Sequence, residues 1–233
     1  MRKLCRCHFI YLLNRTTLLI FFLILFLSFL GFLDSAISLD RKEMAFLNNN
    51  YYYQNSFFIL NLLGIFTSVF IYSHSFLLKC DQYSELILIR KISRSRYFLS
   101  KTLVISLFLI YFLILETSLF LVCGYFFLPK FFPPRDCLLA FFNLLFLSIY
   151  YGLLGLIFFQ IFSNLYVIII PFFLFIFGSI INESSNKFGV IFNFLFPNYL
   201  SDKSGLVFGS FHIMIVTIVL VLINQLIFLS RDL

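Results

Sequence analysis

The chain has 233 residues, of which 62% are hydrophobic, 21% aromatic and only 12% charged. A soluble domain carries about twice that charged fraction, and apolar runs long enough to cross a bilayer recur along this chain. These features exclude an ordinary soluble domain and predict an all-helical integral membrane protein. The net charge of +7 comes from bases between the apolar runs, which is typical of membrane topology and does not indicate a nucleic-acid partner.

Residues 1–15 mix basic and apolar side chains and predict a helix that lies on the inner membrane surface. A secretory signal peptide is the competing interpretation. The next apolar run is long for a signal peptide, and Asp34-Ser35-Ala36 is a poor cleavage site. We therefore expect a first membrane span at 16–33.

Five more spans are expected, at about 56–78, 102–127, 137–159, 165–181 and 209–229. Gly152 and Gly155 in the fourth span should permit close approach of another helix. Pro171 lies early in the fifth span, where proline is tolerated. The stretch 188–196 would reach only about 14 Å as a helix, so we expect an interfacial or re-entrant extracellular segment rather than a span.

Six spans place both termini on the same side of the membrane. Most of the 17 basic residues then fall on the side of the termini, which the positive-inside rule assigns to the cytoplasm. The sequence therefore predicts a multi-pass plasma-membrane protein with both termini cytoplasmic.

The only long charged stretch between spans is 79–101, KCDQYSELILIRKISRSRYFLSK. Asp81 and Glu85 open it and Arg90, Lys91, Arg94 and Arg96 follow, an order that suits the dipole of a short helix. One interpretation is a basic loop held against anionic lipid headgroups. The other is a short helix presented to a cytoplasmic partner.

Motifs for the common catalytic chemistries are absent from the sequence. The chain lacks G-x-x-x-x-G-K-[ST], H-E-x-x-H and G-x-S-x-G, so we do not expect an enzyme. Cys5, Cys7 and His8 lie close together, but no second pair of ligands follows in the cytoplasmic segments. We therefore expect free thiols and no metal site.

Glu116 is the only carboxylate within a predicted span. A charge there is costly, so we expect Glu116 to face the helix bundle or to be protonated, with a hydrogen bond to Asn61, Thr67 or Ser68. These four residues are candidates either for a polar contact between helices or for part of a translocation path.

The segment SELILIRKISRSRYFLSK resembles the loop that follows the second span in permeases of ABC type-2 exporters. The shared features are the acidic Glu85, the apolar Leu86–Ile89, the triplet Ile92-Ser93-Arg94, and Lys101 at the entry to the third span. The interfacial N-terminal helix, the six spans, the tight turn between the fourth and fifth, and the re-entrant stretch before the sixth also resemble that family.

This resemblance implies that 79–101 contains a coupling helix, which docks on a separate cytoplasmic ABC ATPase subunit. The expected contact residues are Glu85, Leu86, Ile89, Ile92, Ser93 and Arg94. ATP and Mg²⁺ would bind the ATPase, so no cofactor is expected in this chain, and a second permease half, identical or different, would complete the exporter. Peptide export or bacteriocin immunity is the implied setting. The alternative is an ATP-independent membrane protein, either a secondary transporter or an immunity or sensor protein.

Overall fold

The structure, a computed structural model, describes residues 2–40, 49–76, 93–128, 137–164, 166, 169–181, 192, 194–197 and 206–230. Within these ranges the chain forms helices and no strands. The helices are α1 (Arg2–Leu12), α2 (Arg15–Asp40), α3 (Asn49–Ser75), α5 (Arg94–Phe127), α6 (Cys137–Phe162), α7 (Ile169–Ile181) and α9 (Leu206–Ser230).

Among these, α2, α3, α5, α6 and α9 are long and apolar enough to cross a membrane. The chain is therefore a multi-pass, all-helical membrane protein, as the sequence predicted. The helix in the predicted fifth span, α7, has 13 residues and reaches only about 20 Å, less than the roughly 30 Å of hydrocarbon. A sixth complete span therefore stays a prediction.

The start of the third span differs from the prediction, because the helix begins within the basic segment. We expected it near 102, but α5 begins at Arg94 and runs for 34 residues. The charged side chains do not end the helix, because Tyr97, Phe98 and Lys101 are buried against neighbouring helices. At the opposite end of the bundle, α3 begins before the predicted 56, and its buried Tyr52 donates a hydrogen bond to the Phe120 carbonyl at 2.6 Å.

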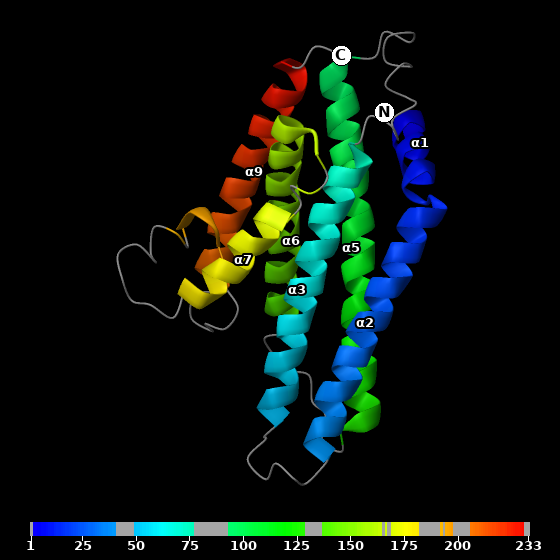
Figure 1. The fold of residues 1–233 in the computed structure, drawn as a ribbon, viewed down its shortest axis with the longest axis vertical. Helices are drawn as coiled ribbons and strands as arrows, with labels where there is room; N and C mark the ends of the chain where they lie inside the picture. The colour runs from blue at the N-terminus through cyan, green and yellow to red at the C-terminus, as the bar shows by residue number, and fades with distance from the viewer. Residues whose placement is uncertain are drawn as a thin grey trace.

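Helices α3 and α6 lie side by side in the bundle and form its most extensive helix pair (Figure 1). They run parallel, and two glycines of α6 face α3. A Cβ atom on Gly152 would lie 2.3 Å from Ser68 Oγ, and one on Gly155 would lie 2.7 Å from Val69 Cγ1. Only glycine fits at this separation, which confirms the prediction that these residues permit close helix approach.

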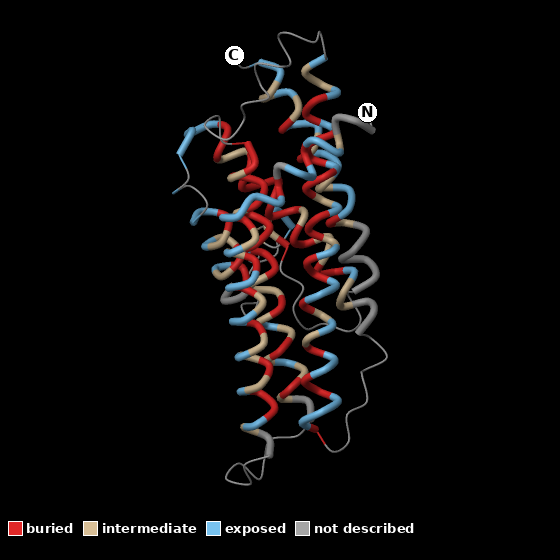
Figure 2. Tube along the Cα trace, turned by 90° about the vertical axis from the view of Figure 1, so that its right-hand side faces the viewer, coloured by how far each residue is buried: buried red, intermediate tan, exposed pale blue. Residues whose placement is uncertain are grey.

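The remaining helices pack around this pair. Helices α2 and α5 lie on one side, with α1 against α5, and α9 and α7 lie on the other (Figure 1). Buried residues concentrate where the helices meet, and exposed ones line the outer surface (Figure 2). Of the long helices, α6 is the most buried and α9 the least.

The start of α1, the end of α3, the start of α5 and the end of α9 lie at one end of the bundle (Figure 1). Aromatic contacts hold this end together: Tyr97 stacks on Phe228 at 6.2 Å between ring centroids, and Phe98 lies 5.5 Å from the same ring. We call this the basic end, because Arg94 and Arg96 begin α5 here.

The chain turns directly after α6, where the sequence predicted a tight turn. Ser163 has a φ of 54°, a left-handed conformation that reverses the chain directly after α6. Asn164 then accepts a hydrogen bond from the Tyr166 amide at 3.1 Å. Pro171 is buried in the first turn of α7, where its missing N–H leaves no helical hydrogen bond unmade.

Candidate functional site

Glu116 is fully buried in the bundle and receives a hydrogen bond from α2. Ser28 Oγ donates to Glu116 Oε1 at 2.6 Å, while Oε2 has no hydrogen-bond partner among the described residues. The rings of Phe32 and Phe120 meet one turn further along the same two helices, 6.0 Å apart. The carboxyl group thus joins α2 to α5 inside an otherwise aromatic contact.

The expected partners of Glu116 were wrong. Asn61 donates to the Phe57 carbonyl at 2.9 Å and Thr67 to the Leu63 carbonyl at 2.7 Å, both within α3. Ser68 donates across the α3–α6 contact to the Ser148 carbonyl at 2.5 Å. Hydroxyl and amide groups on a membrane helix commonly hydrogen-bond to a backbone carbonyl one turn back, as Asn61 and Thr67 do. All three expected partners therefore bond to backbone carbonyls and none bonds to Glu116. The four candidate residues do not form one polar path.

The predicted coupling residues fall largely outside the described residues. Glu85, Leu86, Ile89 and Ile92 are not described, whereas Ser93 is exposed and Arg94 is half-buried at the start of α5. Ser93 is the N-cap residue of α5, and its carbonyl accepts a hydrogen bond from the Tyr97 amide at 3.1 Å. The two described triplet residues therefore belong to the beginning of a long helix.

Lys101 is a buried cation at the basic end, and sequence reasoning had assigned it to the charged loop. Its Nζ lies 4.6 Å from the centroid of the Phe76 ring and 5.3 Å from that of Tyr97, and it donates to Tyr97 Oη at 3.2 Å. Aromatic faces stabilise a desolvated ammonium group. The spacing of Tyr97 and Lys101, four residues apart on one helix face, was the signal available in the sequence.

Helices α3 and α5, which flank the charged stretch, are also joined through contacts of Tyr97, Phe98 and Lys101. Phe76 directly follows α3, and its ring lies 5.7 Å from that of Phe98 in the first turns of α5. It also lies 6.1 Å from Phe228 near the end of α9. We refer to Phe76, Tyr97, Phe98, Lys101 and Phe228 as the basic-end cluster.

Two adjacent tyrosines of α6 bind the backbone of the segment before α9. Tyr150 Oη donates to the Leu195 carbonyl, and Tyr151 Oη donates to the Pro197 carbonyl at 3.3 Å. Both tyrosines lie near the middle of α6. Leu195 is helical and Pro197 lies just past the helical residues, so these hydroxyls bond carbonyls at a helix end, which have no partner within the helix. Neither tyrosine was among the candidate residues expected from the sequence.

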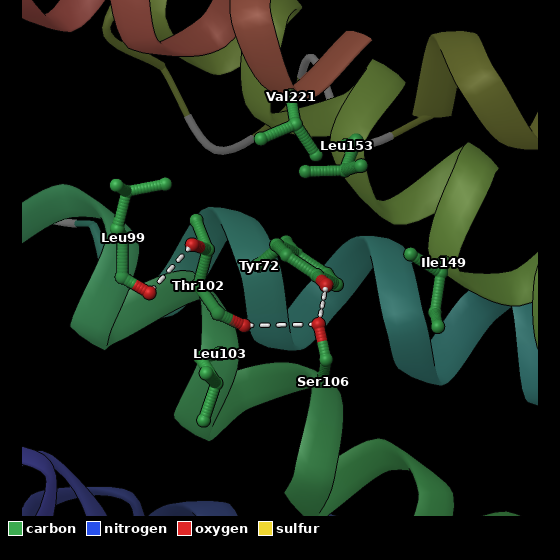
Figure 3. Close-up of a pocket in the computed structure, with 8 residues that line it drawn as sticks. All are labelled: Tyr72, Leu99, Thr102, Leu103, Ser106, Ile149, Leu153 and Val221. Atoms are coloured by element: carbon green, nitrogen blue, oxygen red, sulfur yellow. Dashed lines mark hydrogen bonds between the residues drawn. The ribbon is translucent and has the colours of Figure 1, made fainter. Parts of the chain in front are cut away.

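A cavity of about 360 Å³ opens between α3, α5, α6 and α9 (Figure 3). Leu99, Thr102, Leu103 and Ser106 line it from α5, opposite Tyr72 of α3. Ile149, Leu153 and Val221 complete the lining from α6 and α9. Its volume lies within the usual range for small-molecule sites, about 300–1,000 Å³.

The thiols near the N-terminus form no metal centre in the part of the chain that is described. Cys5, Cys7 and Cys123 are free thiols, and no group of three or more His, Cys, Asp or Glu side chains converges among the residues described. The ring of His8 instead packs edge-on against Tyr97 at 4.9 Å.

No protein-family model matches the chain, and no curated protein matches it significantly. The resemblance to ABC type-2 permeases therefore stays a prediction.

Proposed function

We propose that the chain is the membrane-spanning permease subunit of an ABC exporter. It would act with a separate cytoplasmic ATPase, which binds ATP and Mg²⁺, and with a second permease half. The proposal places the protein in the plasma membrane with the basic end facing the cytoplasm. Helix α7 would then act as the fifth, short membrane segment, and the stretch around 192–197 would be re-entrant.

The observation that carries the proposal is the contact between the described residues on either side of 77–92, which includes most of the charged stretch. Phe76 is the last described residue before 77–92, and Ser93 is the first described residue after it. Phe76 and Phe98 are in contact with each other and both contact Phe228 of α9. Because 77–92 joins Phe76 to Ser93, a force applied to this segment would be transmitted to α3, α5 and α9 together. Coupling by rigid-body movement requires such transmission.

Charge distribution favours the same orientation. Arg94 and Arg96 begin α5 at the basic end, and Arg6 and Arg15 belong to α1 and α2. Lys101 is held near the same end by Phe76 and Tyr97. Basic residues at one end of a bundle are retained in the cytoplasm during insertion, where an ATPase would be accessible to the charged stretch.

The test is to reverse polarity in the expected docking helix. Leu86→Asp and Ile89→Asp should each abolish copurification of the ATPase and its stimulated ATP hydrolysis, because buried interface anchors commonly contribute about 2 kcal/mol or more. The chain is purified from its native membranes, and ATPase subunits are identified by mass spectrometry and assayed in nanodiscs. Arg96→Ala is the matched control, with binding and stimulation largely retained.

The result that would contradict this function is also specific. If no ABC ATPase copurifies with the native chain, or if both Asp variants stimulate hydrolysis as well as the native chain does, the coupling role is wrong. An ATP-independent membrane protein would then be the better reading of the same bundle.

A further inference from the structure

The cavity between α3, α5, α6 and α9 has an apolar surface even though three of its lining residues carry hydroxyls. Tyr72 Oη and Ser106 Oγ hydrogen-bond to each other at 2.7 Å, and Ser106 also donates to the Thr102 carbonyl at 2.9 Å. Thr102 Oγ1 donates to the carbonyls of Phe98 and Leu99, at 3.0 and 3.1 Å. These bonds are visible in part in Figure 3.

Since the hydroxyls are bonded within the protein, the cavity offers a ligand mainly leucine, isoleucine and valine side chains. Water needs two to four polar partners to be held in a cavity, which this lining does not supply. The occupant that the lining favours is therefore apolar.

The rim of the cavity is continuous with a surface that faces outward from the bundle. Leu99 and Leu103 line the cavity and are 36% and 49% exposed. In a membrane protein, exposed leucines on a spanning helix meet lipid tails. The cavity thus opens on the side of α5 that we expect to face the acyl chains of the surrounding leaflet.

A basic side chain lies at the height where the headgroup of such a lipid would sit. Arg96 is exposed, and Leu99 and Leu103 follow it at intervals of three and seven residues, which places all three on one side of α5. From Arg96 to Ser106 the helix rises about 15 Å, half of the roughly 30 Å hydrocarbon thickness. One leaflet of lipid therefore fits between the guanidinium group and the deep end of the cavity.

We propose that this cavity binds one acyl chain of an anionic glycerophospholipid whose phosphate group contacts Arg96. The site is independent of the proposed ATPase partner, because every residue that forms it belongs to this chain. A bound lipid tail would fill the space where four helices meet and would connect α5 to α9 by apolar contact.

Photocrosslinking tests the site directly. The purified full chain is placed in nanodiscs containing a trace of phosphatidylglycerol with a diazirine in one acyl chain, irradiated, digested and mapped by mass spectrometry. We expect adducts concentrated on Leu99–Ser106 of α5 and around Leu153 and Val221. Adducts spread evenly over all exposed apolar helix faces, or absent from the cavity, would overturn the proposal without the use of any variant.

Two matched pairs of variants separate the acyl chain from the headgroup. Val221→Phe should fill the cavity and lower its labelling several-fold, while Leu222→Phe, at a neighbouring position that is 56% exposed, should not. Arg96→Gln should lower labelling by phosphatidylglycerol about fivefold, while Arg15→Gln, an exposed base that begins α2, should leave it unchanged.

The same probe on phosphatidylcholine gives the final arm of the experiment. Weaker cavity labelling by this zwitterionic lipid, with no effect of Arg96→Gln, supports recognition of an anionic headgroup. Equal labelling by the two lipids would overturn the preference for an anionic headgroup, and equal labelling of Arg96→Gln and the native chain by phosphatidylglycerol would overturn the role of Arg96. Equal labelling of native chain and Val221→Phe would overturn the cavity as the binding site, and would leave a transported apolar substrate as its remaining occupant.

Discussion

Replacing Gly152 by alanine should destabilise the bundle at its most extensive helix contact. The new Cβ would lie 2.3 Å from Ser68 Oγ and 2.4 Å from Tyr72 Cδ2, so α3 or its side chains must move. Gly31→Ala in α2 is the matched control. There the nearest atom is Ile59 Cδ1 at 2.8 Å, the flexible end of a side chain that can change rotamer.

The size of the effect follows from three contributions. Alanine favours a helix over glycine by roughly 1 kcal/mol, and this gain applies to both variants. Overpacking costs about 1–3 kcal/mol, and displacement of Ser68 breaks its bond to the Ser148 carbonyl, worth roughly 0.6 kcal/mol within a membrane protein. We expect Gly152→Ala to lower the free energy of unfolding by about 1–2 kcal/mol and Gly31→Ala to leave it equal or slightly higher.

The assay is reversible unfolding by SDS in mixed micelles, followed by far-ultraviolet circular dichroism because the chain has no tryptophan. Adding Ser68→Ala to Gly152→Ala removes the closest atom and should restore part of the lost stability. The same unfolding free energy for Gly152→Ala and Gly31→Ala would refute the close packing of α3 on α6.

The other predictions concern polar contacts and orientation. Glu116→Gln can still accept the bond from Ser28 and should unfold like the native chain, while Glu116→Leu should lose about 1 kcal/mol of unfolding free energy; equal losses in the two variants would show that this bond is not what stabilises the contact. Tyr150→Phe removes only the hydroxyl that binds the segment before α9, so the same SDS titration should show a loss of about 1 kcal/mol, and no loss would mean that the bond adds no stability. In a cysteine-free background, a cysteine at Asn49 should react with an impermeant thiol reagent on intact cells and one at Ser95 should not; labelling of Ser95 from outside would reverse the orientation.

The long helices could be predicted from the sequence because the membrane imposes a minimum apolar length on each of them. The start of α5 could not, because Arg94, Arg96 and Lys101 have the composition of a loop. Burial of Lys101 against Phe76 depends on α3 and α5 meeting in the folded bundle, whereas its contact with Tyr97 lies within α5.

The hydrogen-bond partner of Glu116 could not be predicted from the sequence either. Sequence places Glu116 at a depth in the membrane, but it does not fix the rotation of α2, α3 and α5 about their axes. Ser28 was as plausible a hydroxyl donor as Thr67 or Ser68, and packing alone decided between them. Tyr150 and Tyr151 were missed for a similar reason, because their acceptors are backbone carbonyls, which every residue possesses.

The pairing of α3 with α6 has a consequence for biosynthesis. Residues 76–136 separate the end of α3 from the start of α6, so the two helices enter the membrane at different times. At roughly 5–20 residues per second, ribosomal synthesis leaves α3 waiting several seconds for the helix on which it packs most extensively. During that interval the polar face that includes Ser68 and Ser73 must be covered by lipid, by α2 or by the insertion machinery. Assembly of this bundle therefore finishes late, after α6 has been made, rather than hairpin by hairpin in the order of synthesis.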